Sequence, residues 1–240
     1  MRSRFARALA SGLATSLAMG ALAFAGGPAQ AQQYQVAAET TTTLGMTHVV
    51  AEYRTVSNEL TATVASDAGT PTGSVVFTVS NRGETTVALT DGVARLTLPT
   101  TLRARRTYTI AARYVPADAN EYKESVSGNR FFTVKPARTT VRLVLANTGR
   151  NKRPRASYVL TASNGFVPPA GRVRLEIIKP NRDVRGLRAV KPSAAGRGAT
   201  VFQPTVRRGV WRISARFAGT TNYAASQPAR KTFRVARPAR

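Results

Sequence analysis

The sequence contains no cysteine and only one histidine among its 240 residues. Without cysteine the chain cannot form disulfides, a cysteine-based zinc site or a thiol nucleophile, and it cannot carry a lipid on cysteine. A serine hydrolase triad would have to use the single histidine, His48, and no nucleophile-elbow motif accompanies it. We therefore interpret His48 as a structural residue.

Acidic residues are scarce, above all in the second half of the chain. The sequence has 36 Lys and Arg against 11 Asp and Glu, which gives a formal net charge of +25. By segment, the net charge is +3 for residues 1–31, +1 for residues 32–136 and +21 for residues 137–240. This asymmetry predicts an anionic partner for the second half, or at least that the two halves are separate units. Arginine supplies 30 of the basic residues, which indicates either a coding bias towards arginine or its use in bidentate binding of anions.

The first residues have the pattern of an export signal. Three arginines precede an uncharged and largely apolar stretch over residues 8–38, which contains a Gly-Gly-Pro break and then Ala29-Gln-Ala31. A basic start, an apolar middle and an Ala-x-Ala site are typical of a cleaved secretory signal peptide. We predict cleavage after Ala31, with an uncleaved membrane anchor as the alternative. No second apolar segment follows, so we expect a secreted mature chain without an integral membrane segment.

The rest of the sequence has the alternation of β-strands. Apolar residues recur at every second position in residues 60–64, 75–79 and 108–114, with Thr or Arg between them. This period places one face of each strand against a core and the other in solvent. Turn residues such as Pro71-Thr-Gly73 and Asp91-Gly92 separate the strands. The pattern predicts antiparallel sandwiches with about seven strands per 100 residues.

The same pattern occurs twice. Pro71-Thr-Gly73 aligns with Pro169-Ala-Gly171 at an offset of 98, and residues 108–114 align with residues 211–217 at an offset of 103. An offset that changes only by loop-sized steps indicates a tandem duplication. The sequence therefore predicts three segments: a signal peptide over 1–31, a first immunoglobulin-like domain over 32–136, and a more divergent, basic second domain over 137–240.

These motifs resemble the bacterial Ig-like domain repeats of secreted and surface proteins. The first copy has the threonine run of that family at residues 40–44, the Pro-Thr-Gly turn before a Val-x-Phe strand, the Asp91-Gly92 hairpin and the aromatic strand that leads to Tyr122. The second copy lacks the Asp-Gly hairpin and has a Pro, Gly and Arg-rich stretch at residues 179–198, so its strand count stays open. The resemblance implies an immunoglobulin-like spacer or binding module without a shared catalytic site.

We expect no enzyme activity, no cofactor and no metal. A glycosidase needs two facing carboxylates, whereas the acids of the first domain look like residues of solvated strand faces. Residues 118–121, Asp-Ala-Asn-Glu, lack the dense acidic spacing of a calcium loop. The aromatic residues on the inward phase should be core residues and not stacking platforms for bases. The candidate acids are Glu52, Glu59, Glu84 and Glu121, and the inward aromatics are Phe77, Tyr108, Tyr114, Trp211, Phe217 and Phe233.

Arginines of the second domain fall on one predicted surface. In an immunoglobulin-like sandwich the third, sixth and seventh strands lie side by side in one sheet. Their outward positions in the second domain hold basic side chains, whereas the first domain has Ser74, Val76, Thr109, Arg113 and Thr133 at the matching places. The predicted polyanion-binding residues are Arg172, Arg174, Arg212, Arg216 and Arg234.

The sequence thus favours a secreted, non-enzymatic protein of the extracellular space or cell wall. Its second domain would adhere, without sequence preference, to an anionic polymer such as a wall polymer, an acidic polysaccharide or a nucleic acid. The alternative is a structural spacer or a module that binds another surface protein, in which the charge serves solubility. An enzyme or enzyme accessory ranks last.

Overall fold

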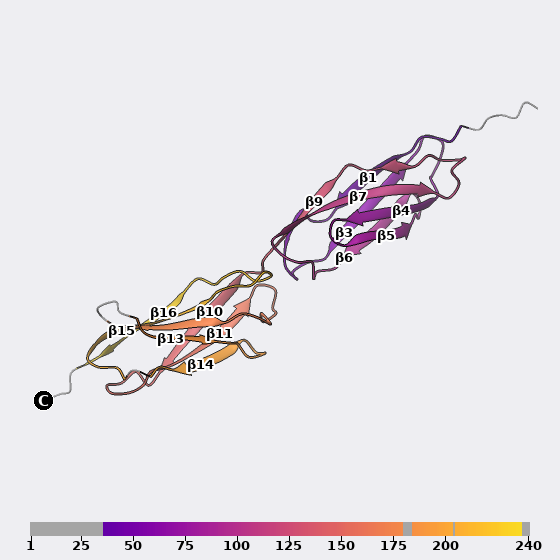
Figure 1. The fold of residues 1–240 in the computed structure, drawn as a ribbon. Coiled ribbons are helices and arrows are strands. Elements are labelled where there is room, and N and C mark those ends of the chain that lie inside the picture. Colours follow the sequence, from indigo (N-terminus) through magenta and orange to yellow (C-terminus); the bar gives the residue numbers. More distant parts are fainter. Residues whose placement is uncertain (1–35, 180–183, 204, 237–240) are drawn as a thin grey trace, which may run out of the picture. The chain divides into compact units, whose positions relative to one another are not determined.

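The computed structural model describes residues 36–179, 184–203 and 205–236, and these residues form strands, turns and loops without a helix (Figure 1). The predicted signal peptide and its cleavage site lie outside the described residues. The strands group into two tandem immunoglobulin-like sandwiches, each made of two sheets. The all-β fold class predicted from the alternation is therefore confirmed.

The first sandwich contains strands β1 to β9. One sheet has the order β1-β3-β6, and the other has the order β2-β9-β7-β4-β5 with β8 paired to β7. All pairings are antiparallel except β2 with β9, which is parallel. The strands are β1 (Thr41–Met46), β2 (Val50–Glu52), β3 (Asn58–Ala65), β4 (Gly73–Val79), β5 (Gly83–Ala88), β6 (Val93–Leu98), β7 (Arg106–Pro116), β8 (Ser125–Val126) and β9 (Arg130–Lys135).

The second sandwich contains strands β10 to β16. Its sheets have the orders β10-β11-β14 and β13-β12-β15-β16, with antiparallel pairing throughout. Part of the Pro, Gly and Arg-rich stretch forms β13 and the start of β14, which gives this sandwich seven described strands. They are β10 (Thr139–Ala146), β11 (Arg155–Ala162), β12 (Val173–Ile178), β13 (Val184–Val190), β14 (Arg197–Val201), β15 (Gly209–Phe217) and β16 (Ala229–Val235).

The residues that the sequence places on the inward faces of the strands form the two cores. Leu60, Phe77, Ile110 and Tyr114 of the first sandwich are fully buried. So are their counterparts Leu160, Leu175, Ile213 and Phe217 of the second. Tyr108 and Trp211 are also buried, and Phe233 is partly buried against the core, so the predicted core role of the aromatics is confirmed.

In each sandwich a buried serine hydrogen-bonds back to the backbone of a long strand that precedes it in the sequence. The Ser127 hydroxyl accepts a hydrogen bond from Ala112 N, and the Ser226 hydroxyl accepts one from Phe217 N, at 3.0 and 2.9 Å. Each serine N–H donates in return to the carbonyl of the same partner residue. These hydrogen bonds satisfy backbone groups that burial would otherwise leave without a partner.

Candidate anion-binding groove

The face of β12, β15 and β16 that points away from the core carries arginine side chains, and this is the sheet face that the sequence predicts for them. On β15 the residues Trp211, Ile213, Ala215 and Phe217 are buried, so the alternating residues Arg212, Ser214 and Arg216 face outward. The same alternation turns Arg174 and Glu176 outward from β12. β12 pairs with β15, and β15 pairs with β16, which confirms that the third, sixth and seventh strands are neighbours.

The register of these strands brings side chains together that are distant in sequence. Arg174 lies directly opposite Arg216, and Glu176 lies opposite Ser214. On the other side of β15, Ser214 lies opposite Arg230 of β16. Directly opposed like charges on a sheet face are unfavourable in the absence of an anion, so this register concentrates a positive potential above the strands.

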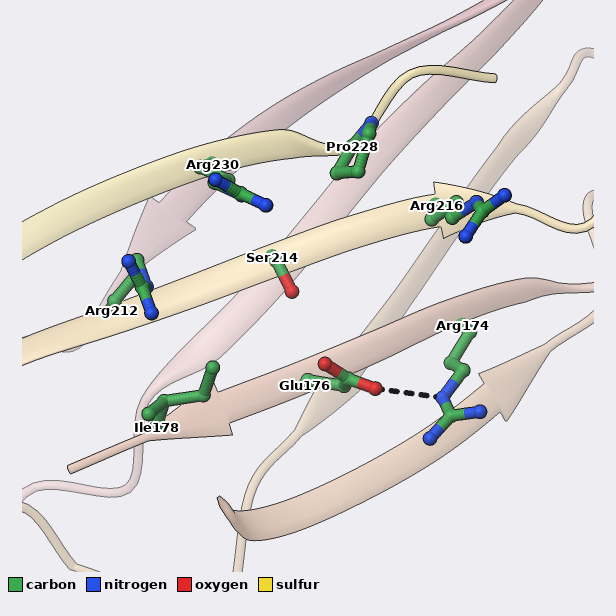
Figure 2. A pocket seen from close by; sticks show the side chains of 8 residues that line it. All are labelled: Arg174, Glu176, Ile178, Arg212, Ser214, Arg216, Pro228 and Arg230. Atoms are coloured by element: carbon green, nitrogen blue, oxygen red, sulfur yellow. Dashed lines mark ion pairs between the residues drawn. The ribbon is translucent and has the colours of Figure 1, made fainter. Parts of the chain in front are cut away.

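A groove of about 360 Å³ runs over these outward side chains (Figure 2). Four guanidinium groups surround one serine and one carboxylate, and two apolar side chains complete the lining. Arg212 and Arg216 lie on either side of Ser214, while Arg174 and Glu176 lie on the neighbouring strand. The lining residues are Arg174, Glu176, Ile178, Arg212, Ser214, Arg216, Pro228 and Arg230.

One ion pair lies within the groove. Arg174 Nε is 2.7 Å from Glu176 Oε1, and the two residues follow each other on the outward face of β12. The Glu176 side chain is 26% exposed and that of Arg174 is 61% exposed. One carboxylate against four guanidinium groups leaves the groove with an excess of three positive charges. A guanidinium group can also bind a carboxylate or phosphate through two parallel hydrogen bonds.

The groove contains three of the five arginines that were predicted from the sequence, namely Arg174, Arg212 and Arg216. Arg172 is exposed but precedes the start of β12, and Arg234 is exposed opposite Val210 towards the far end of β16. Neither is among the residues that line the groove. The sequence interpretation missed Glu176 and Arg230, although both continue the period-2 alternation of their strands.

The first sandwich has no comparable concentration of charge at the corresponding positions. The positions of Arg174 and Arg216 correspond to Val76 of β4 and Arg113 of β7, which lie opposite each other in the first sandwich. Arg113 also lies 3.5 Å from the carboxylate of Glu124. A neutral residue therefore replaces one guanidinium group, and a nearby acid neutralises the other.

Two other groups that the sequence singles out, His48 and Asp118, lie in loops of the first sandwich. Asn58, which is 1% exposed, holds the backbone of His48 by accepting from its N–H at 2.9 Å and donating to its carbonyl at 2.8 Å. Asp118 accepts hydrogen bonds from both nitrogens of Asn120 and so closes a turn. The described part of the chain contains no group of three or more His, Cys, Asp or Glu residues placed to hold a metal ion. It also contains no helix long and apolar enough to cross a membrane.

Comparison with known proteins finds no matching family profile and no matching curated protein. Among solved structures, a tetra-tandem repeat from the extending region of a large adhesion protein is 17% identical, with a TM-score of 0.43, and covers 82% of this chain and 49% of that chain. Invasin, a bacterial integrin-binding protein, is 15% identical with a TM-score of 0.46, and the Yersinia pseudotuberculosis adhesin InvE is 16% identical with a TM-score of 0.38. The alignments with invasin and with InvE each cover 81% of this chain, but they cover only 39% of the invasin chain and 59% of the InvE chain.

Proposed function

We propose that this chain is an exported adhesion module without enzymatic activity, whose second sandwich binds an anionic polymer through the arginine groove. The observation that supports the proposal most directly is the convergence of Arg174, Arg212, Arg216 and Arg230 on one groove. The first sandwich, with a net charge of +1 for residues 32–136, serves in this proposal as a spacer. The location that fits such a module is the cell wall or the extracellular space.

Binding should be electrostatic and insensitive to the sequence of the polymer. Arginines that neutralise charges on a polyanion release its counterions, so affinity falls as salt rises. Readout of nucleic acid bases would require a recognition element in a groove of the duplex or aromatic platforms for stacking. The groove lies over the face of a sheet, and none of its lining residues is aromatic.

The first test replaces the four groove arginines together by threonine in the chain from Gln32 onward. With duplex DNA as the probe polyanion, the slope of log affinity against log salt should become shallower by up to about 3 to 4 units, because each neutralised phosphate contributes about 0.9. Fluorescence anisotropy over a salt series measures both slopes. The unfolding temperature should not fall, because exposed strand positions tolerate polar exchange and the substitutions relieve the repulsion between the opposed arginines.

A matched control replaces four exposed arginines of the same half that lie outside the groove. These residues are Arg142, Arg155, Arg197 and Arg208. The control variant loses the same net charge, so a groove-specific contact predicts a much smaller change of slope than in the groove variant. Equal changes in the two variants would show that only the total charge matters and would contradict binding through the groove.

A second prediction concerns export. The Ala29-Gln-Ala31 site indicates that the protein recovered from the medium or cell wall begins at Gln32, which N-terminal sequencing or intact mass would reveal. Protein that retains Met1 and stays with the membrane fraction would instead indicate an uncleaved anchor.

A further inference from the structure

The carboxylate of Glu176 is the feature of the groove that simple attraction of a polyanion does not explain. Residues 137–240 contain only two acidic residues, and one of them lies at the centre of the groove. The Glu176 carboxylate pairs with Arg174 through Oε1 at 2.7 Å, but its further lone pairs can accept hydrogen bonds, and its negative charge repels phosphate or carboxylate groups placed next to it. A ligand that fits this groove therefore has to offer hydrogen-bond donors as well as negative charge.

We infer that the groove binds an acidic polysaccharide of the uronic acid class, with the arginines holding sugar carboxylates and Glu176 and Ser214 holding sugar hydroxyl groups. This inference rests on the proposed function, because it names the kind of anionic polymer that the groove selects. Each uronic acid unit carries one carboxylate and several hydroxyl groups. Both chemical features of the groove then have a partner on the same ligand.

The spacing of the groove residues fits alternating anionic and hydroxyl-bearing positions. Arg212 and Arg216 are four residues apart on β15, which corresponds to about 13 Å along a strand. Ser214 lies midway between them, opposite Glu176 on one side and Arg230 on the other. The groove thus has guanidinium groups near both of its ends, and its centre holds Ser214 with the acceptor Glu176 on one side and the guanidinium group of Arg230 on the other.

The carboxylate in the groove disfavours nucleic acid. Every nucleotide carries a phosphate, and the sugar–phosphate backbone of DNA has no free hydroxyl group, so a strand along the groove would place anionic oxygens near Glu176 without a hydrogen-bond donor for it. In addition, the lining offers Ile178 and Pro228, whose aliphatic surfaces can contact the C–H faces of sugar rings, and no aromatic side chain for base stacking.

The experiment measures binding of the chain from Gln32 onward to four probes by isothermal titration calorimetry at about 0.15 M salt. The probes are sodium polygalacturonate, fully methyl-esterified polygalacturonate, inorganic polyphosphate and duplex DNA. We expect polygalacturonate to bind more tightly than polyphosphate or DNA per ionised group, and its neutral methyl ester not to bind.

The decisive variant is Glu176→Gln, which keeps the shape of the side chain and removes its charge. It should weaken binding of polygalacturonate about tenfold, equivalent to about 1.4 kcal/mol, because the hydroxyl groups then donate to a neutral amide oxygen or meet the amide NH2 instead of a charged acceptor. It should strengthen binding of polyphosphate, because a repulsive charge is removed. The control variant Glu59→Gln removes a carboxylate that pairs with Arg95 at 2.6 Å on the first sandwich, and it should change neither affinity.

The outcomes separate the inference from the proposed function. If Glu176→Gln strengthens binding of every polyanion alike, or if polyphosphate or DNA binds the original protein more tightly than polygalacturonate, the inference is wrong and polymer binding stands. If the original protein binds none of the polyanions, the proposed function and the inference both fail. Unchanged circular dichroism and unfolding temperature of Glu176→Gln would confirm that the effect arises in the groove.

Discussion

Replacing Trp211 by alanine should lower the free energy of unfolding of the second sandwich by about 3–5 kcal/mol, the usual range for a truncated core aromatic. Trp211 is 3% exposed on β15, between the two sheets of its sandwich. Its Nε1 donates a hydrogen bond to the carbonyl of Arg207 at 2.8 Å. The substitution therefore leaves a cavity and also removes the partner of a backbone carbonyl.

Differential scanning calorimetry of the chain from Gln32 onward measures this loss. We propose that the two sandwiches fold as independent units with a boundary near Pro136, so only the transition of the second sandwich should shift. Trp211→Phe keeps most of the apolar volume and should cost less than Trp211→Ala. A change near zero for Trp211→Ala would contradict a core position, and an equal shift of both transitions would contradict independent folding.

Gly73→Ala should destabilise the first sandwich by about 2–6 kcal/mol, for two reasons that add. Gly73 begins β4 with a φ of 131°, a conformation that costs other residues about 1–3 kcal/mol. A Cβ at this position would lie 2.7 Å from Ala117 N and 2.9 Å from the carbonyl carbon of Pro116. Backbone atoms cannot move aside as a side-chain end can, so overpacking adds about 1–3 kcal/mol.

Gly83→Ala provides the matched control for this prediction. Gly83 has a φ of 92°, but a Cβ there would meet no atom within 4 Å. It therefore incurs the conformational strain without the close contacts, and the difference between the two variants measures the clash with the β7 end. Equal unfolding free energies for both variants, measured by urea denaturation, would show that the turn at Gly73 relaxes and that the clash is absent.

The alternation of apolar residues predicted the strands and their inward faces because a period of two residues is a local property of each strand. The positions of Phe77 and Tyr114 between two sheets follow from a period of two residues, whatever strand lies beside them. The short strands β2 and β8 were not predicted, since each has only two or three residues and pairs along an edge. No periodicity can be read from so few residues.

The groove was predicted only in part, because its geometry depends on register. The sequence indicates that Arg174 and Arg216 face outward, but only the pairing of β12 with β15 places them opposite each other. Arg230 could have been found by extending the alternation of β16 towards its start. Glu176 could have been found in the same way on β12, but a search for positive charge alone passes over a carboxylate.

The opposed arginines of the groove also make the stability of the folded protein depend on whether an anion is bound. Arg174 faces Arg216 within a half that carries a net charge of +21, and such self-repulsion opposes the compact state. An anion that binds only the folded form adds stability, about 2.7 kcal/mol at a ligand concentration of one hundred times Kd. With binding and export as proposed, copies bound to the polymer should resist unfolding and proteolysis better than free copies.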